Sequence, residues 1–437
     1  HYKLVGASNL GSTDNLKIRL INTSEQDVRV PAGTSLAYIT SPEYLHIPEP
    51  VNSEENLTDY YSYHISSEKS DETAVPEHVK CLYDNLPSEL SDESKRKVKE
   101  LLIQYQHVFS KDENDIGYCP WIEHEIRLLP GAKPVRQPPY QVGHHANQEI
   151  ESHVQKLLDK GWIERVVSTW SSPCLLIPKK DGKTRFVQDY RKVNACSEQD
   201  SYPLPRQDES LEALCGAKYF TTADLTSGYY QVPLSEDAKK ISCFVTKSGT
   251  YGFRRMPMGL NNASGTFERL METVMRGLQW EELLIYMDDI IVFSSDESQH
   301  IDRLARMLSR LQESGLKIKP SKTHLFQREV QYLGHVVNEH GIHTDPKKIE
   351  AISKIPSPKS VPQLRSFLGL TGYYRKFIPN YGGIANPLCK LLKKKAKYIW
   401  SSECEEAFLK LKAALTDHST LAYPDYSKLF ILDTDAS

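Results

Sequence analysis

The residues best suited to chemistry are two adjacent acids, Asp288 and Asp289, which lie between two apolar runs. The runs at 283–285 and 290–293 predict two strands, and hence a hairpin with the acids at its tip. Adjacent carboxylates repel each other and resist burial, so they are costly unless divalent cations lie between them. An ordinary Asp-Asp turn would show the same residues, and the hairpin alone does not decide between the two readings.

A third acid favours the metal-binding reading. Residues 220–224 predict a strand that ends in Asp224, and residues 227–231 predict the turn that follows it. Beside the hairpin, Asp224 would complete a three-carboxylate cluster. Such a cluster holds two Mg²⁺ ions, or Mn²⁺ in their place, about 4 Å apart, one lowering the pKa of a 3′-hydroxyl and one neutralising a triphosphate. We therefore interpret Asp224, Asp288 and Asp289 as metal ligands and catalytic residues.

Helices and strands alternate around these acids. The spacing of apolar residues predicts helices at about 101–108, 150–158 and 300–314. Strand patterns occur at about 174–178 and 184–189. Because the two kinds of element are intermixed, the predicted fold class is α+β. A solenoid or propeller is disfavoured, since no period of about 20 to 50 residues repeats.

Length and composition set the class of protein. A chain of 437 residues is too long for one hydrophobic core, so several packing units are expected. No run approaches the roughly 20 apolar residues that span a bilayer, which predicts a soluble chain without a membrane partner. The eight cysteines contain no C-x-x-C pair, which supports neither a zinc site nor a disulfide framework and favours a reducing compartment. The start at His1, without Met or a signal peptide, predicts a piece of a longer polyprotein.

Charge is distributed unevenly along the chain. Residues 51–94 carry eleven Asp or Glu against two Lys, whereas residues 346–397 carry twelve Lys or Arg against one Glu. The basic segment also contains five aromatic residues: Phe367, Tyr373, Tyr374, Phe377 and Tyr381. Cations among aromatic rings predict a nucleic-acid groove in which the rings stack on bases or sugars. The alternative is a solvated helix face.

The motifs together resemble the reverse transcriptase of gypsy-type long-terminal-repeat retrotransposons, over residues 95–437. They follow the family order: Ser172-Pro173, Lys179-Lys180-Asp181-Gly182, Arg185-Phe186, Asp189 to Asn194, Tyr202 to Pro205, the Asp224 strand, Met256 to Ala263, Tyr286 to Asp289 and Tyr332 to His335. The ordered set is very specific, although each motif alone is weak. The sequence departs from the family at Met258, where most relatives have a larger group, and at Ser264-Gly265, where they have Pro-Ala.

The resemblance implies a right-hand polymerase with fingers, palm and thumb. Its reaction would be the addition of deoxynucleotides from dNTPs to a DNA primer on an RNA or DNA template, with release of pyrophosphate. The implied partners are the RNA template, the DNA primer, their RNA-DNA hybrid and a tRNA primer. The implied location is the cytoplasm, in virus-like particles, within a DNA integration pathway. The host and the oligomeric state stay open.

The predicted organisation has six parts. They are a small N-terminal β unit at 1–50, an acidic linker at 51–94, an extension into the fingers at 95–165, fingers and palm at 166–340, the thumb at 341–398, and a connection with a truncated ribonuclease H start at 399–437.

The resemblance also assigns residue roles. Lys180, its neighbour Lys179 and Arg185 would grip the incoming triphosphate from a fingers hairpin. Tyr229 would stack under the incoming sugar and exclude a 2′-hydroxyl; the alternative is an ordinary core aromatic. The remaining nucleotide-binding residues would be Met258, Gly259, Tyr286 and Met287.

Three further roles follow from the same resemblance. Lys322 would lie near the pyrophosphate and act as general acid, the alternative being a solvated lysine. Leu333 and Gly334 would form the primer grip. Asp435 would be the first metal-binding acid of a ribonuclease H domain whose later carboxylates are absent from this sequence, so that activity is expected to be incomplete.

Two rival functions remain. One is an inactive retroelement remnant that only binds nucleic acid, against which the three intact acids argue. The other is an RNA-templated RNA polymerase with a similar palm. That class usually carries Gly where Tyr286-Met287 stands, and Tyr229 would obstruct ribonucleotides.

Overall fold

The computed structural model describes residues 4–9, 17–22, 74–178, 182, 184–203, 205–394, 396–416 and 420–421. The chain divides into two units, residues 1–70 and 71–437. In the first unit, β1 (Leu4–Asn9) and β2 (Lys17–Asn22) pair as an antiparallel hairpin, within the range where a small β unit was predicted. Every described residue of the predicted site lies in the second unit.

A four-stranded antiparallel sheet, here called the palm sheet, carries the acids. Its strand order is β11-β6-β10-β9, with β6 (Tyr219–Asp224), β9 (Leu283–Tyr286), β10 (Asp289–Ser294) and β11 (His324–Gln327). The two central strands are β6 and β10, and Phe220 and Ile291 on them are fully buried. The predicted hairpin and the predicted strand before Asp224 are therefore both confirmed, and they are neighbours.

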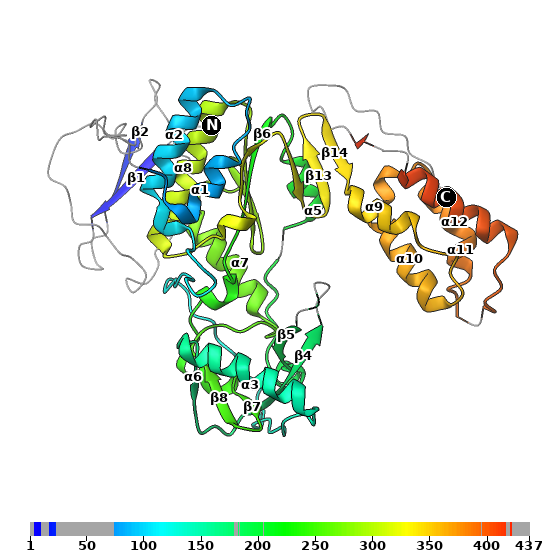
Figure 1. The fold of residues 1–437 in the computed structure, drawn as a ribbon, viewed down its shortest axis with the longest axis horizontal. Coiled ribbons are helices and arrows are strands. Elements are labelled where there is room, and N and C mark those ends of the chain that lie inside the picture. Colours follow the sequence, from blue (N-terminus) through cyan, green and yellow to red (C-terminus); the bar gives the residue numbers. More distant parts are fainter. Residues whose placement is uncertain are drawn as a thin grey trace. The chain divides into compact units, whose positions relative to one another are not determined.

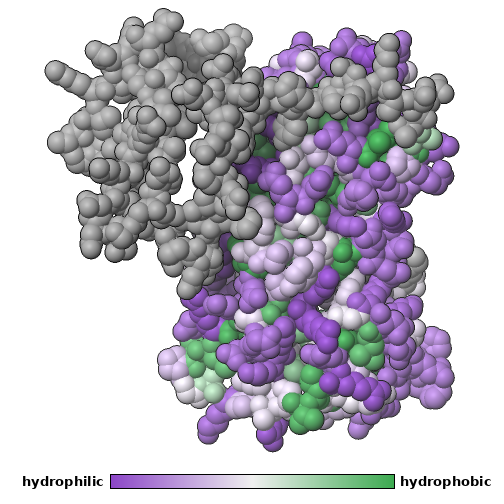
Figure 2. All heavy atoms as spheres, turned by 90° about the vertical axis from the view of Figure 1, so that its left-hand side faces the viewer, coloured by the Kyte–Doolittle hydropathy of each residue, from purple (hydrophilic) through white to green (hydrophobic). Residues whose placement is uncertain are grey.

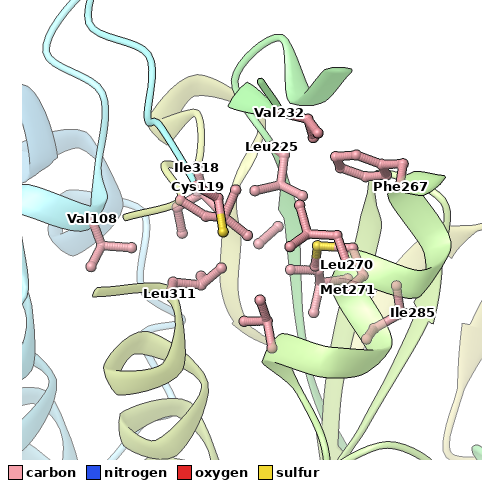
Figure 3. Packing of buried hydrophobic residues seen from close by; sticks show 14 of the residues in the cluster. Val108, Cys119, Leu225, Val232, Phe267, Leu270, Met271, Ile285, Leu311 and Ile318 are labelled. Carbon is pink, nitrogen blue, oxygen red and sulfur yellow. The ribbon is translucent and has the colours of Figure 1, made fainter. Parts of the chain in front are cut away.

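Two long helices cover the palm sheet. They are α7 (Ala263–Val274) and α8 (Glu297–Ser314). Figure 3 shows Phe267, Leu270 and Met271 of α7 packed among Leu225 and Ile285, all of them buried. Close-packed protein interiors have low compressibility, so this packing holds the strand ends, and with them the acids, in fixed positions.

The N-terminal helices correct one prediction. They are α1 (Glu77–Asp84), α2 (Asp92–Gln104) and the 3₁₀ helix η3 (Gln106–Val108). The acidic linker predicted for 51–94 therefore ends earlier than expected, because α1 and the start of α2 lie inside that range. Val79 is fully buried and Leu82 nearly so, one helical turn apart. The surplus of acidic residues on the exposed faces hid this short apolar stripe.

A five-stranded sheet, here called the fingers sheet, has the order β3-β8-β7-β4-β5. Its strands are β3 (Ile163–Arg165), β4 (Ser172–Pro178), β5 (Thr184–Gln188), β7 (Phe244–Thr246) and β8 (Gly249–Phe253). The helices in this part of the chain are α3 (His144–Asp159), α4 (Arg191–Ala195), α5 (Gln207–Glu212), η4 (Gly228–Gln231) and α6 (Glu236–Ile241). Figure 1 shows α3 and α6 close to the strands β4, β7 and β8. The strands predicted near 174–178 and 184–189 are thus confirmed as a hairpin.

A third sheet, here called the grip sheet, follows η5 (Pro320–Lys322) and β11 and has the order β12-β13-β14-β15. Its strands are β12 (Glu329–Tyr332), β13 (His335–Asn338), β14 (Gly341–Thr344) and β15 (Thr420–Leu421). The helices that follow β14 are α9 (Pro346–Ser353), α10 (Val361–Tyr373), η6 (Arg375–Phe377), α11 (Tyr381–Lys390) and α12 (Ser402–Thr416). Together, α9 to α12 are here called the thumb helices.

The thumb helices correct two further predictions. Phe367, Tyr374 and Phe377 are at most 3% exposed, so these rings form a core and cannot stack on bases. Their spacing in the sequence is that of an inward helix face, which the surrounding cations obscured. In addition, Phe408 of α12 packs against Phe367, with 4.6 Å between ring centroids. The predicted boundary at 398 therefore does not separate two cores.

No helix in the described part of the chain is long and apolar enough to cross a membrane. On the face drawn in Figure 2, hydrophobic residues lie in small separate groups among hydrophilic ones. Scattered exposed apolar residues of this kind are normal on a protein surface.

One glycine gives a stability test of this packing. A Cβ on Gly117 would lie inside van der Waals contact of Gln231 Oε1 and of the backbone of Gly315 and Lys317. We expect Gly117→Ala to destabilise the chain by about 1–3 kcal/mol, the usual cost of overpacking. The matched control is Gly369→Ala inside α10, where a Cβ meets nothing within 4 Å and should be neutral or stabilising. Urea unfolding curves of both variants would measure this, and equal midpoints would contradict the packing described.

Candidate active site

The turn between β9 and β10 carries the acidic pair. Tyr286 and Asp289 face each other across the hairpin, so Met287 and Asp288 form its tip. Met287 has φ 56°, a left-handed conformation uncommon for a residue with a side chain. Its backbone N–H donates to Glu268 Oε2 at 3.2 Å, from α7. Glu268 is fully buried, and burial raises the pKa of its carboxyl to about 7. The strained turn is thus tied to the helix beneath it.

The third acid lies on the neighbouring strand. Asp224, the last residue of β6, is directly opposite Asp289 in the antiparallel register. Opposed residues in such a ladder have Cβ atoms about 5 Å apart. Asp288 is joined to the same strand end, since the Leu225 N–H donates to its backbone carbonyl at 3.4 Å. The structure therefore brings the three predicted acids to one end of the palm sheet.

The electrostatics of this end show concentrated negative charge. Desolvation by the surrounding protein, and then the neighbouring Asp288 and Asp224, raise the pKa of Asp289 to about 6, although its side chain reaches solvent. Lys322 acts in the opposite direction and lowers this pKa. The Lys322 Nζ donates to Asp224 Oδ2 at 2.9 Å and is more than half exposed. Lys322 is therefore the cation that compensates the acids in this structure.

The donor set fits a hard divalent cation, but the side chains do not form a finished site. Among the residues that the structure describes, no three His, Cys, Asp or Glu side chains are grouped closely enough to hold a metal ion. Asp224 is instead paired with Lys322. The strand-end positions and the oxygen atoms of the three acids are what Mg²⁺ requires, since it binds few carboxylates together with substrate phosphates. We therefore treat the three acids as a candidate metal site.

A cleft of about 880 Å³ opens on one side of the acids. Six of the predicted site residues line it: Asp224, Asp288, Lys322, Arg185, Tyr229 and Met258. Arg185 lies on β5, opposite Ile177, so it reaches the cleft from the fingers hairpin as predicted. The cleft thus places a guanidinium and an aromatic ring within the same space as two of the carboxylates.

A second cleft of about 460 Å³ adjoins the first at Asp224 and Lys322, which line both. It contains Asp289 and Leu333, the first residue of the predicted primer grip. Gly334 follows in the turn between β12 and β13. Leu333 and Gly334 both have left-handed φ, 46° and 71°. The predicted primer grip is therefore a tight turn beside the acids.

The base of the thumb helices holds this turn. The hydroxyl of Tyr373 donates to the Leu333 carbonyl, and that of Tyr374 donates to the Gly334 carbonyl at 2.7 Å. His335 also contacts the Leu333 carbonyl through Nδ1, at 3.0 Å. Both carbonyls of the turn are therefore fixed, which stabilises its unusual backbone.

Tyr229 is anchored at the cleft wall. Its ring meets Phe267 edge-on with 5.3 Å between centroids, and its hydroxyl lies 3.2 Å from Ser264 Oγ. Ser264 is one of the positions that depart from the resembled family, and here it supplies a partner for Tyr229. Gly228 is needed beside it, because a Cβ there would come within 2.9 Å of Phe267. The half-buried ring is neither free nor part of the deep core.

The other residues predicted to bind the nucleotide differ in where the structure places them. Met258 is 41% exposed in the large cleft. Gly259 has φ 97°, a backbone conformation that favours glycine, and its carbonyl accepts a hydrogen bond from Asn194 Nδ2 at 2.8 Å. In the described part of the chain, Gly259, Tyr286 and Met287 line neither cleft. Their roles remain predictions.

Three predicted residues lie outside the described part of the chain. They are Lys179, Lys180 and Asp435. The triphosphate and ribonuclease H roles assigned to them are therefore not placed.

Sequence reasoning missed several residues of this site. Glu268 supports the turn at Met287, and its signal was an acid between apolar residues on one helix face. Lys111, Lys160 and Lys319 line the large cleft as additional cations. Single lysines in loops have no distinguishing pattern, so only the fold reveals them.

Comparison with known families identifies the class of protein to which this fold belongs. Residues 177–337 match the family described as "Reverse transcriptase (RNA-dependent DNA polymerase)". Residues 400–437 match "RNase H-like domain found in reverse transcriptase". The chain therefore belongs to the reverse transcriptase family.

Its relatives narrow this to retrotransposon Pol polyproteins. The chain is 38% identical over 354 residues to the Pol polyprotein from transposon 297 of Drosophila melanogaster, covering 80% of this chain and 33% of the relative. It is 33% identical over 437 residues to the Pol polyprotein from transposon 412 of Drosophila melanogaster, covering 99% of this chain and 33% of the relative. The chain is thus the reverse transcriptase region of a long-terminal-repeat retrotransposon Pol polyprotein of the gypsy, 412 and 297 kind, with the start of an RNase H-like domain. It spans about a third of the length of these relatives.

Solved structures support the right-hand fold. The foamy viral protease-reverse transcriptase in complex with double-stranded DNA is similar at a TM-score of 0.73 and 26% identity, covering 82% of this chain and 74% of that one. The same viral protein in complex with an RNA/DNA hybrid is similar at a TM-score of 0.70 and 26% identity, covering 79% of this chain and 46% of that one.

Proposed function

We propose that this chain is an active RNA-directed DNA polymerase that extends a DNA primer with dNTPs on an RNA or DNA template. The observation that carries the proposal is the convergence of Asp224, Asp288 and Asp289 on one end of the palm sheet, between two clefts. Divalent cations bound there would lower the pKa of the primer 3′-hydroxyl and neutralise the triphosphate. RNA template, DNA primer and their hybrid are the proposed partners, as in the complexes of the foamy viral protein.

Other residues of the chain would bind the triphosphate, select the sugar and position the primer end. Arg185 offers a planar fork of donors, which suits bidentate contact with phosphate oxygens. Tyr229 presents a fixed ring where a sugar would lie. The turn at Leu333 and Gly334 positions the primer end beside Asp289, so that attack is in line with the leaving pyrophosphate.

Primer extension tests the proposal against its two rivals. The substrate is a labelled DNA primer on an RNA template with Mg²⁺, offered dNTPs or rNTPs in separate reactions. We expect template-directed extension with dNTPs only, abolished by a chelator. Hybrid binding without extension would favour the inactive remnant, and extension with rNTPs would favour an RNA polymerase.

Removal of Lys322 gives a second test. The Lys322 ammonium lies in both clefts, 2.9 Å from Asp224, where it can donate a proton to the leaving pyrophosphate. We expect Lys322→Met to lower kcat for single-nucleotide addition by about 10²-fold, the usual contribution of a general acid. The KM for dNTP should change much less. Lys354→Met, which breaks an exposed ion pair with Glu350 in the thumb helices, is the control. Unchanged kcat in Lys322→Met would show that Lys322 is only a solvated lysine.

A further inference from the structure

We infer that Gln207 is a positioning residue that couples the primer-grip turn to the acidic hairpin. The inference rests on the proposed polymerase function and names a residue that the mechanism above does not use. Gln207 is the first residue of α5, a short helix between the palm sheet and the thumb helices, and its side chain is half-buried. It touches a residue from each of these two parts.

The contacts form a continuous chain of polar groups. The Gln207 amide Nε2 lies 3.2 Å from the hydroxyl of Tyr286, the last residue of β9. The amide Oε1 lies 3.4 Å from the hydroxyl of Tyr373, the last residue of α10. Tyr373 in turn donates to the carbonyl of Leu333 in the primer-grip turn. Four groups thus connect the acidic hairpin to the turn beside the primer end.

The single proton of the Tyr373 hydroxyl determines the direction of these hydrogen bonds. The hydroxyl of Tyr373 has one proton, which it gives to the Leu333 carbonyl, so towards Gln207 it can only accept. If the Gln207 amide is turned by 180°, its N–H donates to Tyr373 and its carbonyl accepts from the Tyr286 hydroxyl. Amide oxygen and nitrogen are interchangeable in shape, so the turned amide fits the same space. Gln207 and Tyr373 then each donate one hydrogen bond and accept one, and hydrogen bonds linked in this way strengthen one another.

This row of hydrogen-bonded groups ends at the acidic hairpin on one side and at the primer-grip turn on the other. The distance between these two parts determines how well the primer end is aligned with the acids. Tyr286 is paired with Asp289 across the hairpin, so a shift of Tyr286 moves that carboxylate. Leu333 and Asp289 line the same cleft. A link between the two ends therefore sets the distance between the primer end and the acids, to which the rate of in-line attack is highly sensitive.

A neighbouring contact supplies a matched control. Asp208, next to Gln207 on α5, forms an ion pair with Lys376 of η6 at 3.0 Å. That pair also joins α5 to the thumb helices but does not lead to Tyr286. Because Asp208 is largely exposed, the pair contributes little to stability. Asp208→Asn therefore breaks a similar connection outside the proposed chain.

The test measures single-nucleotide addition by Gln207→Leu, which keeps the side-chain volume and removes both polar atoms. We expect kcat to fall about tenfold through misalignment, with the KM for dNTP and the Kd for the hybrid within about twofold. Asp208→Asn should keep kcat within about twofold. Thermal unfolding of each variant shows whether the fold is kept.

A double-mutant cycle separates positioning from general destabilisation. If Gln207 acts through Tyr286, then Gln207→Leu should add little to the loss already caused by Tyr286→Phe. Losses that multiply, or an unchanged kcat in Gln207→Leu beside an active wild type, would overturn the inference alone. A wild-type chain that bound the hybrid without extending the primer would overturn the proposed function and this inference together.

Discussion

Asp288→Asn and Asp289→Asn should each lose primer extension by several orders of magnitude while keeping the fold, because cation binding depends on these charges. Both side chains are exposed, so neither contributes to packing. The raised pKa of Asp289 also shows that its charged form is disfavoured where it lies. A neutral amide of the same shape removes that repulsion, so stability should be unchanged or slightly higher. Primer extension with Mg²⁺, beside a thermal unfolding curve, measures both effects.

Asp302→Asn is the matched control for the two acid variants. Asp302 is an exposed acid on α8 that lines neither cleft in the described part of the chain. It should extend the primer as the wild type does. Near-normal extension by a folded Asp288→Asn or Asp289→Asn chain would remove these residues from the catalytic site.

Tyr229→Ala should admit ribonucleotides. The ring is fixed by Phe267 and Ser264 at the wall of the large cleft, so it would discriminate by steric clash with a 2′-hydroxyl. A clash with one small group changes selectivity on the order of a hundredfold. We therefore expect kcat/KM for an rNTP to rise by about that factor, with a much smaller fall for the matching dNTP. Single-nucleotide addition with each substrate gives both numbers.

Tyr229→Phe distinguishes the ring from its hydroxyl. This variant loses only the contact with Ser264 and keeps the edge-on packing against Phe267. It should reject ribonucleotides nearly as well as the wild type. If Tyr229→Ala changed both substrates equally, Tyr229 would be a structural residue only.

Local patterns predicted the acidic hairpin well. The apolar runs on either side of Asp288 and Asp289 have strand periodicity, and the structure places them as β9 and β10. The strand that ends in Asp224 and the helix at about 300–314 were predicted for the same reason. Such features depend only on residues that are close together in the sequence, so they can be predicted from one sequence alone.

Features that depend on distant contacts were missed or misread. Phe367, Tyr374 and Phe377 were expected in a nucleic-acid groove, yet they are buried in the thumb helices. Phe367 of α10 packs against Phe408 of α12, which lies about 40 residues later in the sequence, and no local pattern reports such a contact. Glu268 and Gln207 escaped notice because their partners, Met287 and Tyr286, follow about 20 and 80 residues later. No local periodicity reports such pairs.

Mn²⁺ binding tests most directly whether the three acids together hold the divalent cations of polymerisation. The sample is the chain on a primer ended by a dideoxynucleotide, with the next dNTP present so that no chemistry occurs. Electron paramagnetic resonance counts the bound Mn²⁺. We predict about two ions per complex, the number expected of a two-metal site, and clear loss of this binding in Asp289→Asn and Asp224→Asn but not in Asp302→Asn. Equal Mn²⁺ binding by the wild type and by both acid variants would contradict the account.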